Sequence, residues 1–347
     1  MDASISIMNE GNSNSGSAVD ELSTELLQFC ESDSLSEEGL RKIIEKYELT
    51  PDHNRHLDNN FSYEFFFRAC YNKRLVEKVI RLLIEYFPDA PNATDSEGYT
   101  PLHFAFLNKN MTFNIIQLLI EAAPDSVQAA PDSVRHTDED GGLLIHFLCN
   151  SLIKEEKVVM KVLKLLLDKF PESTRRTNNK GFLPLHYAAR KKSPEFCQLL
   201  IKSYPNSARV RNSDGELPLH FVCARNNRPT VEYFYNLYPD AINHDNSRGS
   251  YPIHFAIMNG KGRRRAALDI ARFLLNCDLR VKLQKYKGES LLHFTCLQDF
   301  DDPNENVGAC VQMIETIYNA NPESIHCTNE KGDLPIHRLC HCNREKP

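Results

Sequence analysis

One short pattern recurs along this chain and limits what it can fold into. A histidine returns seven times, each time directly after Leu or Ile and five residues after a glycine. The histidines are His103, His146, His186, His220, His254, His293 and His337. The glycines are Gly98, Gly141, Gly181, Gly215, Gly249, Gly288 and Gly332. A catalytic histidine occurs once among unlike partners, whereas a histidine that recurs with its whole neighbourhood belongs to a repeated structural unit. The chain is therefore expected to be a stack of repeats.

The repeated unit has a regular order of signals. A polar turn ends in the glycine, and in five copies a proline stands two residues before the histidine, as at Pro101 and Pro184. Proline is tolerated in the first turn of a helix, where its missing N–H has no partner to lose. A second helix follows with apolar residues three or four positions apart, as at Phe196, Leu199 and Leu200. It is predicted to end at an aromatic residue followed by proline, because proline disfavours helix at the residue before it.

The spacing of the histidines separates the basic unit from its insertions. Successive histidines are 43, 40, 34, 34, 39 and 44 residues apart. The shortest interval gives the unit, and the longer ones predict insertions in loops, where few contacts depend on length. One insertion reads as a duplication, AAPDSVQ at 122–128 followed by AAPDSVR at 129–135. Others are predicted at 150–156, 259–265 and 298–306.

Three segments are expected along the chain. Residues 1–20 are rich in Ser, Asn and Gly and are predicted to be disordered. Residues 21–58 carry two amphipathic helical patterns and are interpreted as a helical N-terminal cap. Residues 59–347 form the repeat array, whose first copy is degenerate, with Phe65 to Phe67 where later copies have the histidine, and whose last copy is incomplete at Pro347. A terminal repeat is expected to lack the internal signature, because it packs on one side only.

Composition excludes several classes of protein. The net charge is −6 and the pI about 6.1, so no global basic field favours nucleic acid or anionic lipid. No apolar run reaches the roughly 18 residues of a membrane helix, and the N-terminus has no secretory pattern. The 11 cysteines without close pairing suggest reduced thiols, hence a cytoplasmic location and the nucleus as an additional one.

The unit resembles the ankyrin repeat, whose signature is T-P-L-H-x-A. The closest copy is Thr100 to Ala105, TPLHFA, and Pro184 to Ala189 is nearly as close. The resemblance runs from about residue 60 to the end and implies an all-α ankyrin-repeat solenoid of helix–turn–helix units with short turns or hairpins between them. The sequence departs from the family in keeping the usual threonine only at Thr100 and in replacing the helix-ending glycine by the aromatic–proline pair.

The resemblance also implies a function and a surface. Ankyrin arrays are mostly binding modules, so the chain is expected to be a non-enzymatic scaffold or adaptor that binds other proteins, as a monomer and without a cofactor, through the concave surface of inner helices and turns. The candidate contact residues lie at turn tips, beside the glycine, and at the ends of the first helices, where the copies differ. They are Tyr99, Lys180, Phe182, Arg190, Lys191, Asp214, Glu216, Arg225, Arg248, Ser250, Tyr286, Lys287 and Glu289. No catalytic, cofactor or metal residue is assigned.

The recurring histidine and its neighbours have a structural and a chemical interpretation. In the family the ring makes hydrogen bonds within and between repeats, and we expect that here. In four copies a cysteine follows three residues later, a spacing that suits zinc, but the family has alanine there and core packing is favoured. The aromatic residue after most of the histidines is expected to pack on the next repeat, with a binding stripe as the alternative.

Two further features stay open at this point. The cluster His337, Cys340, His341 and Cys342 supplies the alternative function, a metal-binding or regulatory fragment. A basic loop, Lys261 and Arg263 to Arg265, faces an acidic one at 299–305 in the next unit. The two loops either attract each other weakly in solvent or form a docking or nuclear-import site.

Overall fold

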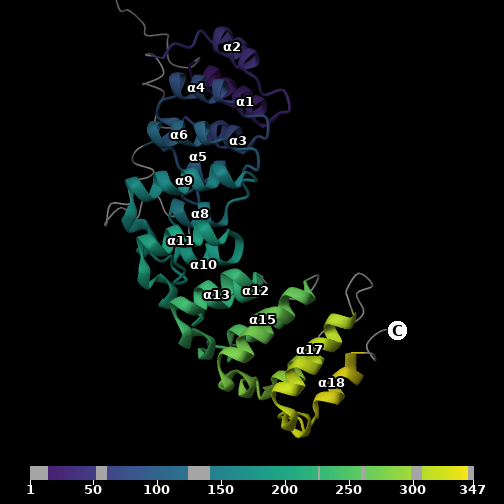
Figure 1. Cartoon of the computed structure of the whole chain (residues 1–347). Coiled ribbons are helices and arrows are strands. Elements are labelled where there is room, and N and C mark those ends of the chain that lie inside the picture. Colours follow the sequence, from purple (N-terminus) through teal and green to yellow (C-terminus); the bar gives the residue numbers. More distant parts are fainter. Residues whose placement is uncertain are drawn as a thin grey trace, which may run out of the picture. The chain divides into compact units, whose positions relative to one another are not determined.

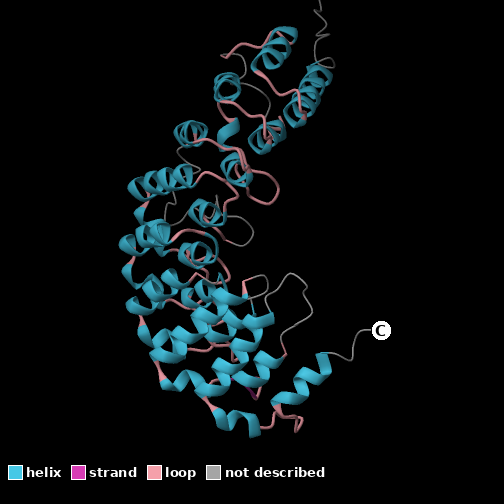
Figure 2. Ribbon diagram, turned by 45° about the vertical axis from the view of Figure 1, so that its right-hand side comes forward, coloured by secondary structure: helices cyan, strands magenta, loops and turns pink. Residues whose placement is uncertain are grey.

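Short helices in consecutive pairs make up almost all of the structure, a computed structural model that describes residues 15–51, 61–123, 141–225, 227–258, 263–297 and 307–342 (Figure 2). One two-stranded antiparallel sheet occurs within these residues. The chain divides into two compact units, Met1–Ser173 and Thr174–Pro347. The all-α repeat fold expected from the sequence is confirmed.

The first unit contains helix pairs that stack in sequence order. Its elements are α1 (Ser15–Glu31), α2 (Glu37–Lys46), α3 (Glu64–Tyr71), α4 (Glu77–Tyr86), the 3-10 turn η2 (Ala90–Asn92), α5 (Pro101–Leu107), α6 (Phe113–Ala122), α8 (Leu144–Asn150) and α9 (Glu156–Lys169). The first helices contact one another in the series α1, α3, α5 and α8, and the second helices in the series α2, α4, α6 and α9 (Figure 1). Phe65, Phe66, Leu83 and Ile115 are almost completely buried between the two rows.

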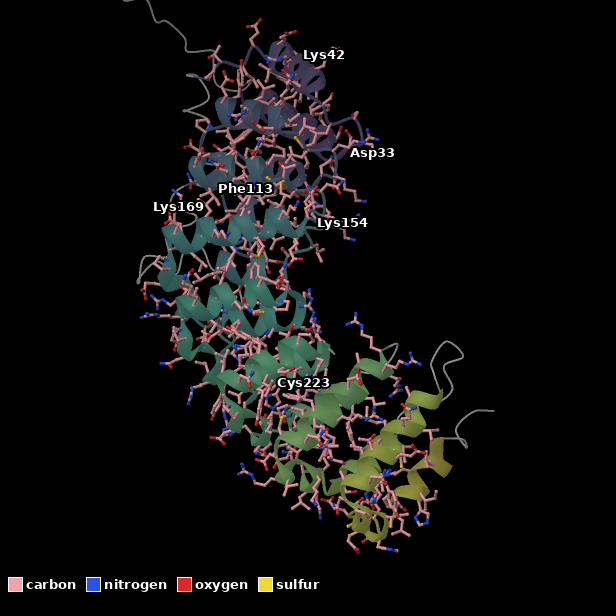
Figure 3. All side chains as sticks on the ribbon, in the orientation of Figure 1. Asp33, Lys42, Phe113, Lys154, Lys169 and Cys223 are labelled. Atoms are coloured by element: carbon pink, nitrogen blue, oxygen red, sulfur yellow. The ribbon has the colours of Figure 1, made fainter. Side chains whose placement is uncertain are left out.

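The helices before the repeat signature continue both rows. α1 packs on α3 and α2 packs on α4, in the same way as later pairs pack on each other. α1 begins at Ser15, ahead of the boundary expected at residue 21. Within the first unit Lys161 of α9 lies over the ring of Phe113 of α6, 5.4 Å from its centroid, and Figure 3 labels this ring.

The second unit repeats the arrangement. Its elements are the 3-10 turn η4 (Pro171–Arg175, which begins in the first unit), α10 (Pro184–Lys191), α11 (Pro194–Ser203), η5 (Pro205–Arg209), α12 (Pro218–Arg225), α13 (Arg228–Leu237), η6 (Pro239–Asn243), α14 (Pro252–Met258), α15 (Arg264–Cys277), η7 (Leu279–Leu283), β1 (Lys285–Tyr286), β2 (Glu289–Ser290), α16 (Leu291–Cys296), α17 (Val307–Ala320), η8 (Pro322–His326) and α18 (Pro335–Cys342). The inner helices α10, α12, α14, α16 and α18 contact in series, and so do the outer helices α13, α15 and α17.

Local sequence signals set the helix ends. The Ser193 hydroxyl accepts a hydrogen bond from the backbone N–H of Phe196 at 3.3 Å and caps α11. The helix ends at Tyr204, as the aromatic–proline pattern predicts, and Pro205 then starts a 3-10 turn. The same aromatic–proline pattern follows α9 and α13, and after α17 a proline preceded by Asn321 likewise begins a 3-10 turn. After α15 no proline is present, and the Asp278 side chain caps the turn instead by accepting from the N–H of Arg280.

The predicted insertions lie partly outside the described residues. The stretch at 150–156 is a loop between α8 and α9, as expected. The duplicated stretch falls outside the described residues from residue 124 on, and so do residues 259–262 and 298–306. Residues 1–14 of the segment predicted to be disordered also lie outside them.

Candidate partner-binding surface

Five of the described turns between repeats are built by an Asn or Asp three residues before the glycine. The carboxamide oxygen of Asn178 accepts hydrogen bonds from the N–H groups of Lys180 and Phe182, at 3.1 and 2.9 Å. The backbone N–H of Asn178 donates to Phe182 O, and the N–H of Gly181 donates to Asn178 O. Asp95, Asn212, Asn246 and Asn329 make equivalent turns. A short polar side chain that bonds its own backbone is what holds such a turn.

The copy that lacks this residue closes its turn differently. Lys285 stands where the others have Asn or Asp, and the chain forms a hairpin that pairs Lys285 with Ser290 and Tyr286 with Glu289. Both central residues have positive φ, 49° at Lys287 and 75° at Gly288. A two-residue hairpin needs positive φ at both positions, so Lys287 holds a left-handed conformation that most residues avoid.

Neighbouring turns in the second unit are joined by backbone hydrogen bonds. The N–H of Ser213 donates to Lys180 O at 3.0 Å, and the N–H of Ser247 donates to Asp214 O at 2.8 Å. Gly215 has a φ of 77°, and a Cβ added there would lie 3.2 Å from the nitrogen of Ser247. This glycine therefore serves both a positive φ and a close backbone approach.

The recurring histidines tie the start of each inner helix together. The Nδ1 atom of His186 accepts a hydrogen bond from the N–H of Leu183 at 2.9 Å, and the same bond recurs in the other copies except at His293, where Ser290 Oγ lies 2.8 Å from Nδ1. The Nε2 atom of His186 lies 3.3 Å from the carbonyl oxygen of Glu216 in the next repeat, and His293 makes the equivalent contact with Asp333 at 2.9 Å. The expected hydrogen bond within the repeat is thus observed, and the contact between repeats is seen at His186 and His293.

Burial makes two of these histidines weak bases. Burial lowers the pKa of His220 to about 4, although backbone groups of Leu217 and Ser250 oppose the shift. Burial, with a contribution from His220, lowers the pKa of His254 to about 3. Both rings are therefore neutral near pH 7, as their hydrogen bonding as acceptors through Nδ1 requires.

The aromatic residues after the histidines pack between repeats. Phe221 has its ring centroid 6.4 Å from that of Phe255, and Phe182 lies 5.7 Å from Phe221. In the first unit Phe67 and Phe104 are 5.3 Å apart. Phe67 is buried and the other rings are half-buried, so the expected packing on the next repeat is observed.

The turn tips are the exposed part of each turn. The residue before the glycine is exposed and charged in every copy that the structure describes there, negative in two copies and positive in the other four. In the first unit it is Glu97, and in the second Lys180, Asp214, Arg248, Lys287 and Lys331. Four of the predicted contact residues are thus exposed turn tips, namely Lys180, Asp214, Arg248 and Lys287.

The residues beside the glycine face their neighbours more than solvent. Tyr99 is half-buried, with its ring 5.7 Å from that of Phe147, and Phe182 is 5.6 Å from the ring of His186. Tyr286, the residue before the hairpin turn, contacts Phe294 at 5.6 Å. The carboxylate of Glu216 accepts from the carboxamides of its own turn and the next, at 3.0 and 3.2 Å. The contact of Phe182 with His186 and that of Tyr286 with Phe294 lie within one repeat, and those of Tyr99 and Glu216 also join neighbouring repeats.

Two of the residues predicted to contact a partner are buried, which argues against that role. Ser250 is 5% exposed and Glu289 is 8% exposed. The Glu289 carboxylate accepts a hydrogen bond from Asn329 at 3.2 Å and forms an ion pair with Arg338, both in the next repeat. The Glu289 side chain is therefore covered by the following repeat and is not available to a partner. The sequence position beside the glycine does not reveal this, because it does not show how the next turn packs.

The predicted residues at the ends of the inner helices lie close together. Arg190 and Lys191 end α10 and are exposed, and Arg225 ends α12 and is half-exposed. Arg263, from the predicted basic loop, donates from Nη1 to the carbonyl oxygen of Arg225 at 3.0 Å. The acidic loop expected to face it lies outside the described residues, and so does Lys261.

The cysteines of the inner helices are core residues. Cys149 and Cys223 are completely buried and Cys296 is 2% exposed, and Figure 3 labels Cys223 on α12. Burial raises the pKa of the Cys223 thiol. Within the described part of the chain no three His, Cys, Asp or Glu side chains are grouped to hold a metal ion. The side chains of Cys340, His341 and Cys342 lie outside it, so the metal-binding alternative stays a hypothesis.

The role of Asn and Asp in building the turns was not predicted. Their signal was present, since an Asn or Asp stands three residues before the glycine in five copies, at Asp95, Asn178, Asn212, Asn246 and Asn329. Nor was Asn108 predicted, which is 3% exposed and donates to the carbonyl oxygens of Cys70 and Asn72 in the preceding repeat.

Stacked helix pairs, glycine turns and buried histidines define a helical repeat protein. Two family models described as ankyrin repeats in many copies match the chain, one over residues 59–120 and the other over residues 166–222. The chain is an ankyrin repeat protein. No curated protein matches it. None of the described helices is long and apolar enough to cross a membrane.

Proposed function

We propose that this protein is a non-enzymatic scaffold or adaptor that binds partner proteins through its turn tips and inner-helix ends. Ankyrin repeats are generally protein–protein interaction modules. The observation that carries the proposal is the row of exposed charges before the turn glycines. Each is carried by a turn whose backbone is fixed by hydrogen bonds, while its sign differs between copies.

Rigid turns with variable charged tips suit selective recognition. A binding group that is already ordered loses little conformational entropy when it binds. Opposite and like charges across an interface select the correct partner and repel others. The tips of the second unit alternate and then become basic, in the order Lys180, Asp214, Arg248 and Lys287. A partner would therefore be selected by the order of the charges on its own surface, which must complement those of the turn tips.

The thiols support a reducing location, cytoplasmic and additionally nuclear. Nine cysteines among the described residues are thiols that form no disulfide bond, and most of them are buried. Free buried cysteines are typical of compartments that keep thiols reduced. Fractionation of tagged protein tests this location.

The test of the binding function is affinity capture from native lysate followed by mass spectrometry. One variant changes Lys180, Asp214, Arg248 and Lys287 to Ala, and a matched control changes Gln198, Lys202, Asp269 and Glu315, which are exposed on outer helices. We expect a partner that wild type and control retain and the tip variant loses. A partner retained by all three proteins, or none captured by wild type, would contradict the proposal.

A further inference from the structure

Charge is distributed very unevenly along this chain. Residues 174–297 contain 21 Lys and Arg against 9 Asp and Glu, a net charge of +12. The remaining residues contain 20 basic against 38 acidic residues, a net charge of −18. The overall value of −6 therefore conceals a basic region within the second unit. A local excess of this size attracts anionic partners to that region.

Part of this excess is gathered into one basic patch, which we define as Arg190, Lys191, Arg225 and Arg263. Lys191 and Arg225 each occupy the eighth position of an inner helix that begins with proline, so they hold equivalent places in consecutive repeats. α10 packs against α12, and Arg263 is joined to the carboxyl end of α12 by its hydrogen bond to Arg225. The four side chains therefore follow the repeat axis along one edge of the inner helices.

No carboxylate of the described residues neutralises the basic patch. None of its four residues forms an ion pair within the described part of the chain, whereas Arg228 and Arg280 nearby are paired with Glu232 and Asp278. Glu195 is the single acidic residue between 174 and 213, and it makes no ion pair with the described residues either. Burial and the charge of Arg190 lower the pKa of Lys191, a cost that a bound anion would reduce.

The geometry indicates the form of the anion. Neighbouring packed helices lie about 8–10 Å apart, and an extended polyproline II chain advances about 3.1 Å per residue and places every third side chain on the same face. Three residues of an extended peptide therefore cover one repeat. An acidic side chain at every third position would meet Lys191 and then Arg225 with Arg263.

We propose that the basic patch binds an extended acidic segment of a partner protein, with Asp or Glu at every third residue. This inference rests on the proposed binding function and specifies the chemistry of the partner. Arg225 and Arg263 supply planar guanidinium groups that can bind a carboxylate with two hydrogen bonds, and Lys191 supplies a point charge.

The same observations disfavour a nucleic acid in this place. Single strands are held largely by bases stacked on exposed aromatic rings, and the basic patch contains no aromatic side chain. The rings of Phe221 and Phe255 on α12 and α14 are engaged with each other between repeats. A long polyanion would also meet the acidic remainder of the chain, whereas a short acidic segment need only cover the basic region.

The test uses the full-length protein and fluorescence anisotropy. The probe is a labelled short peptide with Glu at every third position and Gly or Ser between, and its control has Gln in place of Glu. We expect the Glu peptide to bind, binding to weaken as salt rises, and the Gln peptide not to bind. The double variant Arg190→Glu and Lys191→Glu should weaken binding about tenfold or more. The control variant Lys202→Glu and Arg272→Glu, on the outer helices α11 and α15, should bind like wild type.

The outcomes separate this inference from the binding function itself. If circular dichroism shows that the double variant is unfolded, the Arg190→Ala and Lys191→Ala pair replaces it. The basic patch proposal would be overturned by any of three results. The Arg190 and Lys191 variant and the Lys202 and Arg272 control could lose affinity equally, the Glu peptide could fail to bind, or a single-stranded oligonucleotide of the same charge could bind more tightly. If a partner protein is lost by the turn-tip variant but still captured by the Arg190 and Lys191 variant, the proposed function stands and the acidic-segment inference is rejected.

Discussion

Replacing Gly181 by alanine tests how much of a turn glycine's role is conformation and how much is contact. Gly181 and Gly249 have nearly the same backbone conformation, with φ of 73° and 79°. A Cβ at Gly181 would lie 2.9 Å from the backbone nitrogen of Ser213 in the next turn, whereas a Cβ at Gly249 would meet nothing within 4 Å. Gly249→Ala is therefore a matched control within the same unit.

The two substitutions share one cost and differ in another. The left-handed conformation costs alanine about 1 kcal/mol in both variants, and alanine lowers the entropy of the unfolded chain equally in both. At Gly181 the neighbouring turn must also move, which strains its packing and weakens the bond from Ser213 N–H to Lys180 O. Overpacking costs about 1–3 kcal/mol, and one hydrogen bond contributes about 1 kcal/mol. We expect Gly181→Ala to be destabilised by about 2 kcal/mol more than Gly249→Ala.

The assay is urea denaturation followed by circular dichroism, combined with amide hydrogen exchange. Repeat arrays can unfold in parts, so the free energy of unfolding is compared only where the two curves have the same slope. Exchange at the amide of Ser213 should become faster in Gly181→Ala and stay unchanged in Gly249→Ala. Equal destabilisation of the two variants, with unchanged exchange at Ser213, would refute the view that the neighbouring turn requires this glycine.

Three further perturbations have expected outcomes. Lowering the pH from 6.5 towards 4 should destabilise the second unit, because burial keeps His220 and His254 neutral, with pKa values of about 4 and about 3, while the unfolded chain takes up protons near pH 6.5. The loss approaches about 1.4 kcal/mol per pH unit for each ring. Urea denaturation at a series of pH values measures this loss of stability. If the free energy of unfolding of His254→Asn fell with pH as steeply as that of wild type, the result would contradict this explanation. Asn108→Ala removes two hydrogen bonds to the preceding repeat and should cost the first unit about 1–3 kcal/mol in thermal unfolding, whereas Asn110→Ala, at an exposed position, should cost less than half as much. Glu289→Ala should speed amide exchange in the last turn and helix, because Asn329 and Arg338 both bind the carboxylate that is lost. Unchanged exchange would show that these contacts do not stabilise the last repeat.

Local signals in the sequence were enough for the fold. The interval between Gly215 and Gly249 and the equal spacing of their histidines revealed the unit. The end of α11 at Tyr204 followed from Pro205. Such features can be predicted because each depends on a few residues that are adjacent in the chain.

Contacts between repeats were harder to predict. Ser250 and Glu289 stand in variable positions beside a glycine, yet both are buried, and Glu289 is bound by the next repeat. The sequence analysis placed Arg190, Lys191 and Arg225 on the binding face, but their junction with Arg263 depends on how α12 and the start of α15 pack.

The sequence by itself determined the repeat, its helix ends and its glycine turns, because these arise from backbone conformation and from side chains within a few residues. Only the tertiary structure decided which polar side chains are buried and which charges gather. The carboxylate of Glu289 meets Arg338 across a repeat, and the low pKa of His254 comes from the atoms packed around it. Solvation and Coulomb interactions act through space, and residues about one repeat apart in the chain become neighbours only when the repeats stack.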